Sequence, residues 1–342
     1  MKAFPCHLYM LYQNEKGEIY PCPRANKSHL IGRITEIDII KKILYFQPPH
    51  CECSICELRA ATTEERERGI INTNLEIGGE CNGACVYCFQ KTLSTFRQHY
   101  PYYQELFSFY KALDKLEYTT VFGGEVSFQP STLDLIAMIK REHNTNVSIV
   151  TNGFIPFEKF GCICENVDSF QVSFNGFSKK SMYYISKIDI EVVKSFCEYL
   201  SRKNEKNLDV KLLVSPLSVG DIVDFLEWSL SINVSHVMIY YAIIPSPDYE
   251  ENGNREVSSL DHMIPGYWDE ILYRINADFQ QFFKVHYAEI IQRGVNYIIN
   301  KEILKLLKLP EDYLEKLNIP SNRSISITCK AWAEFISKYN GD

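Results

Sequence analysis

The chain has 342 residues, of which 46% are hydrophobic and 23% are charged, as in ordinary globular proteins and unlike disordered ones. This length allows one large domain of about 200–250 residues and a smaller one. The net charge is −7 without any block of Lys or Arg, so nucleic acid is not an expected partner. The first ten residues lack the apolar core of a signal peptide, and no run of 18 apolar residues follows. We therefore expect a cytoplasmic protein without membrane contact.

Five cysteines lie near the start of the chain, and they are Cys6, Cys22, Cys51, Cys53 and Cys56. In a long cytosolic protein such a group indicates metal or redox chemistry rather than disulfides. Gly17 and the residues after it predict a hairpin turn and a strand that leads to Cys22, and Gly32 predicts another turn. We expect a small cysteine-rich domain over residues 1–66, bounded by the charged stretch 64–70.

The central part, residues 67–245, alternates short β-rich runs with stretches whose apolar residues recur at helical spacing. The predicted strands are Ile71–Ile77, Tyr118–Phe122, Val147–Val150, Ser169–Phe174, Val210–Val214 and Val234–Tyr241. The predicted helices are Tyr102–Leu116, Ser131–Glu142, Ile190–Lys203 and Val219–Ser231. Six such units predict an α/β fold, either a partial barrel or a doubly wound sheet, with the active site at the carboxyl ends of the strands.

Residues 246–342 are expected to form a mainly helical extension, with a helical region from about Tyr267 to Leu309. Four cysteines are scattered outside the two groups and are expected to be buried apolar residues; they are Cys162, Cys164, Cys197 and Cys329. The eight histidines occur singly, so no catalytic histidine is predicted.

Cys81, Cys85 and Cys88 follow the first strand of the central part at the spacing CxxxCxxC. Four thiolates close a four-iron cluster, so three thiolates in one short loop leave one iron open. An open coordination position is a reaction site, as it is for catalytic zinc. A closed electron-transfer cluster completed by a fourth cysteine, or a zinc site, is the structural alternative.

Further motifs occur at the ends of the next three predicted strands. Gly123-Gly124-Glu125 follows the second strand, Thr151-Asn152-Gly153 the third, and Ser173-Phe174-Asn175-Gly176 the fourth. Together with CxxxCxxC, this series resembles the radical SAM superfamily, which carries GGE, TNG and SxDG at these places. Val126 stands where the family usually has proline, and Asn175 stands where it usually has aspartate.

The resemblance covers about residues 70–245 and implies a partial (β/α)6 TIM-like barrel with a [4Fe–4S] cluster on the triplet. It also implies S-adenosylmethionine at the open iron, cleaved by one electron to a 5′-deoxyadenosyl radical that abstracts hydrogen from a substrate inside the barrel. Such an oxidoreductase implies an electron donor such as flavodoxin or ferredoxin as a partner. The implied cofactor contacts are Tyr87, as the aromatic residue against the adenine, and Gly123, Gly124, Glu125, Thr151, Asn152 and Ser173.

The cysteine-rich head resembles the SPASM and twitch extensions of this superfamily, which open with C-x(9–15)-G-x(4)-C and bind auxiliary [4Fe–4S] clusters. Here the head precedes the barrel, whereas those extensions commonly follow it. We expect one auxiliary cluster on four of the five head cysteines. Zinc on four of these thiolates, or on three and His50, is the alternative, because both metals accept tetrahedral thiolate sites. Structural thiols without metal are a third possibility.

Three functions stay open. The first is oxidation or cross-linking of a peptide or protein side chain, because SPASM-type heads resemble those of peptide maturases and sulfatase-activating enzymes. The second is a small-molecule dehydrogenase or epimerase that uses the same radical chemistry. The third is a non-catalytic iron–sulfur electron carrier or scaffold, which would not bind S-adenosylmethionine. The sequence identifies no catalytic acid or base on the substrate side.

Overall fold

The computed structural model describes residues 10–14, 16–20, 30–36, 38–39, 72–78, 80–88, 100–113, 116–203, 207–245, 256–258, 269–310 and 312–317. The head cysteines Cys6, Cys22, Cys51, Cys53 and Cys56, together with His50 and Cys329, lie outside these ranges. The chain divides into two compact units. The first consists of Met1–Cys81, Thr95–Val150 and Gly161–Asp168, and the second of Asn82–Ser94, Thr151–Phe160 and Ser169–Asp342.

The first unit contains a mainly parallel sheet. Its strands are β1 (Met10–Gln13), β2 (Glu18–Tyr20), β3 (Gly32–Arg33), β4 (Asn72–Glu76), β5 (Tyr118–Phe122) and β6 (Asn146–Thr151). Strands β1, β4, β5 and β6 are parallel neighbours in that order, and β2 and β3 add an antiparallel edge beside β1. Gly17, with φ of +72°, forms the turn between β1 and β2, so the predicted hairpin is confirmed.

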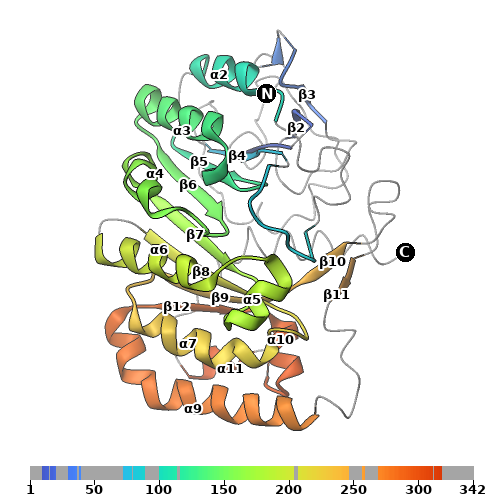
Figure 1. Ribbon diagram of the computed structural model, residues 1–342, viewed down its shortest axis with the longest axis vertical. Coiled ribbons are helices and arrows are strands. Elements are labelled where there is room, and N and C mark those ends of the chain that lie inside the picture. Colours follow the sequence, from blue (N-terminus) through green and yellow to red (C-terminus); the bar gives the residue numbers. More distant parts are fainter. Residues whose placement is uncertain are drawn as a thin grey trace, which may run out of the picture. The chain divides into compact units, whose positions relative to one another are not determined.

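Two helices of the first unit, α2 (Tyr103–Lys111) and α3 (Pro130–His143), pack against each other and cover this sheet (Figure 1). Helix α3 begins at Pro130, whose fixed φ suits the first helical position, and ends at Asn144 in the left-handed conformation. The Tyr110 hydroxyl of α2 hydrogen-bonds to Thr73 of β4 over 2.9 Å. A short helix, α4 (Phe160–Asn166), follows β6.

The second unit has its own parallel sheet, formed by β7 (Ser169–Phe174), β8 (Asn207–Val214), β9 (His236–Tyr241) and β12 (Asn296–Ile299) in that order. Alternate residues of β7 and β8 are buried, because α6 (Ile190–Lys203) and α7 (Ile222–Ser231) cover one face. Helix α9 (Asp269–Arg293) packs on α7 (Figure 1). The remaining elements are α5 (Lys179–Ser186), the hairpin β10 (Ile243–Pro245) and β11 (Glu256–Ser258), α10 (Lys301–Leu306) and α11 (Tyr313–Lys316).

The predicted α/β fold is confirmed, with all six strands and all four helices present. In each unit the parallel strands lie in chain order, whereas a doubly wound sheet reverses its order at a switch point. The fold is therefore of the partial (β/α)6 barrel type. The helical region predicted for Tyr267–Leu309 was wrong at Asn296–Ile299, which forms β12 instead. The proposed domain limits 1–66, 67–245 and 246–342 stay predictions.

Candidate functional site

The segment that leads from β4 to Cys81 is fixed by backbone contacts with the loop after β5. The amide of Ile77 donates to the carbonyl of Phe122 over 2.8 Å, and the amide of Glu125 donates to the carbonyl of Glu80 over 2.8 Å. Gly124 has φ of +51°, and a Cβ there would lie 2.5 Å from the Glu80 oxygen. Only glycine allows this approach. Gly124 is thus needed to hold the chain immediately before the first cysteine.

Gln129 joins the same segment to helices α2 and α3. Its side-chain amide donates to the carbonyls of Gly78 and Glu80, each over 3.1 Å, and its side-chain oxygen accepts the Tyr103 hydroxyl over 2.8 Å. The Tyr103 hydroxyl also contacts Thr132. Gln129 is completely buried, and a buried amide is stabilising only when such bonds are made. Gln129 was not among the predicted site residues, because no motif of the sequence includes it.

Glu125, a predicted cofactor contact, is completely buried, and its side chain accepts hydrogen bonds from the loop that contains it. One carboxylate oxygen accepts the amide of Ser127 over 3.0 Å and its hydroxyl over 2.6 Å. Val126, at the place of the family's proline, is also buried. In this chain the GGE segment therefore shapes the turn after β5.

In the second unit, Asn82 anchors the loop of the triplet to the turn after β6. The Asn152 amide donates to the Asn82 side-chain oxygen over 2.8 Å, and the Asn82 amide donates to the Phe154 carbonyl over 2.7 Å. Asn152 also accepts the amide of Phe154 over 2.8 Å, and Thr151 accepts the amide of Gly153 over 3.0 Å. Thr151 and Asn152 thus order the turn that holds Asn82.

The same loop is bonded to the carboxyl end of α5. The amides of Ala84 and Val86 donate to the carbonyls of Ser186 and Ile185, each over 2.8 Å. The last carbonyls of a helix have no partner within it, so the cysteine loop satisfies two of them. At the other end of α5, Ser178 and Ser181 form a capping box.

Asp221 fixes the amino end of α5. Its carboxylate accepts the amide of Phe177 over 2.7 Å and the hydroxyl of Ser181. A Cβ at Gly176 would overlap Ser181, so the close approach of α5 to the end of β7 requires glycine. The chain from Asn175 onward is therefore held tightly.

The predicted ligands divide between the two units. Cys81 is the last residue of its segment in the first unit, whereas Cys85 and Cys88 belong to the second. All three thiols are half-buried. The amide of Cys88 donates to the carbonyl of Cys85 over 3.2 Å, and the Asn175 side-chain amide lies 3.2 Å from the Cys85 sulfur. Tyr87 and Ser173, two predicted cofactor contacts, are also half-buried.

These features fit an iron–sulfur cluster. The backbone around the triplet is hydrogen-bonded within the protein, and the three cysteines are only half-buried. Across the described ranges, no three His, Cys, Asp or Glu side chains converge as one metal ion would require. Thiolates on separate irons of a cluster need no such convergence.

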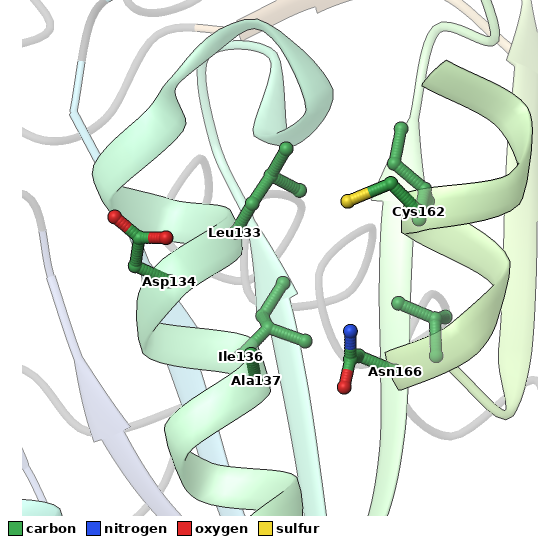
Figure 2. A pocket seen from close by; sticks show the side chains of 8 residues that line it. Leu133, Asp134, Ile136, Ala137, Cys162 and Asn166 are labelled. Carbon is green, nitrogen blue, oxygen red and sulfur yellow. The ribbon is translucent and has the colours of Figure 1, made fainter. Parts of the chain in front are cut away.

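A shallow groove between α3 and α4 lies apart from the motifs (Figure 2). Cys162 points into it opposite Leu133, with Asp134 and Asn166 at its edges. Cys162 is exposed and Cys164 half-buried, so the expectation that both are buried was wrong, whereas Cys197 is buried as predicted. One thiol and one carboxylate do not form a ligand set, and no chemistry is assigned to this groove. Within the described part of the chain, no helix is long and apolar enough to cross a membrane.

Comparison with solved structures finds radical SAM enzymes. Streptococcus suis SuiB bound to its precursor peptide SuiA has a TM-score of 0.48 and 13% identity, over 70% of this chain and 51% of that one. The enzyme anSMEcpe with bound AdoMet and a peptide has a TM-score of 0.45 and 16% identity, over 67% of this chain and 63% of that one. Methylornithine synthase (PylB) has a TM-score of 0.43 and 9% identity, over 76% of this chain and 86% of that one. The chain thus spans about half the length of SuiB.

No curated protein matches the chain. The family model of the radical SAM superfamily matches residues 75–228. This match contains the whole cysteine triplet and the three motifs that follow it, on strand ends of the expected fold. Residues 75–228 of the chain therefore form a radical SAM domain.

Proposed function

We propose that this protein cleaves S-adenosylmethionine reductively and uses the 5′-deoxyadenosyl radical to abstract hydrogen from a substrate. Cys81, Cys85 and Cys88 would hold the [4Fe–4S] cluster, which supplies the electron when bound. The observation that carries the proposal is the hydrogen-bonded loop with three half-buried thiols, inside the segment that matches the family. The family also implies an electron donor as a partner.

The chain's own residues would bind and orient S-adenosylmethionine. Tyr87 would pack on the adenine, Ser173 would offer a hydroxyl, and the backbone of Gly123 and Gly124 would approach the methionine group. Glu125, Thr151 and Asn152 would act less directly, because their hydrogen bonds shape the turns beside the cysteines. These roles follow from the family's motifs.

The face of the second unit's sheet away from α6 and α7 is the proposed substrate side. Ser173 and Lys211 are partners in register on β7 and β8, so their side chains are neighbours on this face. Parallel sheets are usually apolar on both faces, whereas here Gln171, Ser173 and Lys211 are polar and half-buried. Lys211 makes no ion pair in the described part of the chain. We propose that it meets a carboxylate of the substrate.

For the substrate we propose a peptide or protein side chain, oxidised or cross-linked, with the cysteine-rich head as the supporting feature. To test this, the reconstituted enzyme is incubated with peptides encoded beside its gene, and the masses of the peptides are measured by mass spectrometry. Loss of two hydrogens from a Cys-, Ser- or Tyr-bearing peptide is the expected result. Turnover of a free sugar, amino acid or nucleotide instead would identify a small-molecule dehydrogenase or epimerase.

The auxiliary [4Fe–4S] cluster remains part of this proposal, with zinc as the alternative. Anaerobic reconstitution followed by iron and sulfide analysis should give roughly eight irons per chain for two clusters. The double variant Cys51→Ala/Cys53→Ala keeps only three head cysteines, so it should lose iron only from the head and should still cleave S-adenosylmethionine. A count of roughly four irons in the unaltered chain would contradict the auxiliary cluster, and bound zinc would identify the other metal.

A further inference from the structure

The side chain of Asn175 contacts Cys85 of the triplet. Asn175 lies directly after β7, and its side-chain nitrogen is 3.2 Å from the sulfur of Cys85. The side chain is only 8% exposed. The segment that follows is fixed by the bond from Phe177 to Asp221 and by the tight contact of Gly176 with α5. Asn175 is thus held at the sulfur by a rigid stretch of chain.

The chemistry of the two groups fixes the direction of this bond. A thiolate that ligates iron has no proton and can only accept, and an asparagine amide donates through its nitrogen. An aspartate at this position, as in the family's usual motif, has no proton to donate when ionised and adds a negative charge. Asparagine at this position therefore offers the sulfur a hydrogen-bond donor, whereas an ionised aspartate here would be a repulsive neighbour.

Hydrogen bonds to the sulfurs are among the factors that set the reduction potential of an iron–sulfur cluster. Reduction adds negative charge to the cluster, and part of that charge resides on the sulfurs. A donor at the sulfur stabilises the reduced form, which raises the potential, whereas a carboxylate destabilises the reduced form and lowers the potential. The effect is strongest where water is excluded, as around the buried Asn175.

We propose that Asn175 is a positioning residue that donates a hydrogen bond to the Cys85 thiolate and sets the cluster at a higher reduction potential than an aspartate would. This inference rests on the proposed function, because it requires Cys85 to ligate the cluster. It concerns the ease of reduction and does not require Asn175 to touch S-adenosylmethionine or substrate.

The test is a redox titration of reconstituted protein followed by electron paramagnetic resonance. Only a cluster with an open iron can bind S-adenosylmethionine, so the signal that changes when it is added identifies the triplet's cluster. The midpoint potential of this signal should fall in Asn175→Ala and fall further in Asn175→Asp, with the iron content unchanged. Asn207→Asp is the charge-matched control, because Asn207 is exposed at the opposite end of the same sheet, and its midpoint should stay at the wild-type value.

Two results would overturn the proposal. One is an unchanged midpoint in both Asn175 variants. The other is loss of the cluster from both variants while circular dichroism shows an intact fold, because Asn175 would then serve assembly rather than potential. Failure of the proposed function is seen separately, since the wild-type protein would then show no signal that responds to S-adenosylmethionine.

Discussion

Four side-chain amides surround the segments that carry the cysteines. Gln129 holds the chain before Cys81, Asn152 holds Asn82, and Asn175 contacts Cys85. An amide group offers both donors and an acceptor, so each can join two backbone or side-chain groups at once. Side-chain amides and backbone groups therefore fix the segments on both sides of the thiols.

The variant Gln129→Ala tests how much these hydrogen bonds stabilise the first unit. The change removes one of the two donors to each of the carbonyls of Gly78 and Glu80 and the acceptor of the Tyr103 hydroxyl. Three buried hydrogen bonds are lost, so we expect a loss of about 1–3 kcal/mol in the free energy of unfolding. Urea denaturation measures it. Gln104→Ala on the exposed side of α2 is the matched control. Equal unfolding midpoints for the two variants would show that Gln129 does not stabilise this loop.

A pH-dependent prediction concerns Tyr103. Desolvation raises the pKa of Tyr103 to about 12, partly offset by its hydrogen bond to Thr132. Because the folded pKa exceeds the unfolded value of 10.0, this tyrosine's contribution is present below pH 10 and is lost as the pH rises toward 12. Between pH 9 and 11 the loss is about 1 kcal/mol.

Tyr103→Phe should therefore lower stability at pH 9 but lose less of it between pH 9 and 11 than the unaltered chain. Urea denaturation at the two pH values measures the difference. The control Tyr118→Phe, at an exposed site, should lose as much stability between pH 9 and 11 as the unaltered chain does. A decline in Tyr103→Phe equal to that of the control would disprove the assigned titration.

The sequence allowed the strands that carry the cysteine and glycine motifs at their ends to be predicted, because the spacing and order of these motifs are local patterns. It did not reveal Gln129 or Asn82, whose partners lie 51 and 72 residues away in the chain. Such bonds exist only after folding brings the loops together. Asn82 was nevertheless inside the CxxxCxxC motif, so its position could have drawn attention to it.

Helix α5 connects the end of β7 to the cysteine loop. Its amino end is held by Asp221 and its carboxyl end accepts the amides of Ala84 and Val86. This helix was not predicted, because its eight residues give little helical periodicity. The strand β12 was missed for a similar reason, since four residues between two helices resemble a continuation of helix.

Asp221→Ala tests the role of α5. The change removes the acceptor for Phe177 and Ser181, so α5 should open more often and release the loop amides. A cost of about 1–2 kcal/mol corresponds to roughly 5–30-fold faster hydrogen exchange at Ala84 and Val86. Asp224→Ala, exposed on α7, should leave the exchange unchanged. Unaltered protection of both amides in Asp221→Ala would contradict this role of α5.

At the scale of the whole molecule, the family match covers residues 75–228, whereas the head with its five cysteines precedes it. The barrel-type order of strands could be predicted because β-rich runs and helical stretches alternate clearly. Strand β1 extends the parallel sheet beside β4, and no pattern of the sequence could show this pairing across about sixty residues of chain. The radical SAM domain is therefore better defined by the sequence than the substrate is.

The most direct test of radical SAM chemistry is release of 5′-deoxyadenosine from S-adenosylmethionine by the reconstituted, dithionite-reduced protein, measured by liquid chromatography. The unaltered chain should release it, and so should Cys162→Ala, which alters an exposed thiol away from the motifs. Cys85→Ala should release none, because the cluster would lose one of its three ligands. No release from the unaltered chain with its cluster intact, or equal release from Cys85→Ala, would contradict the proposed function.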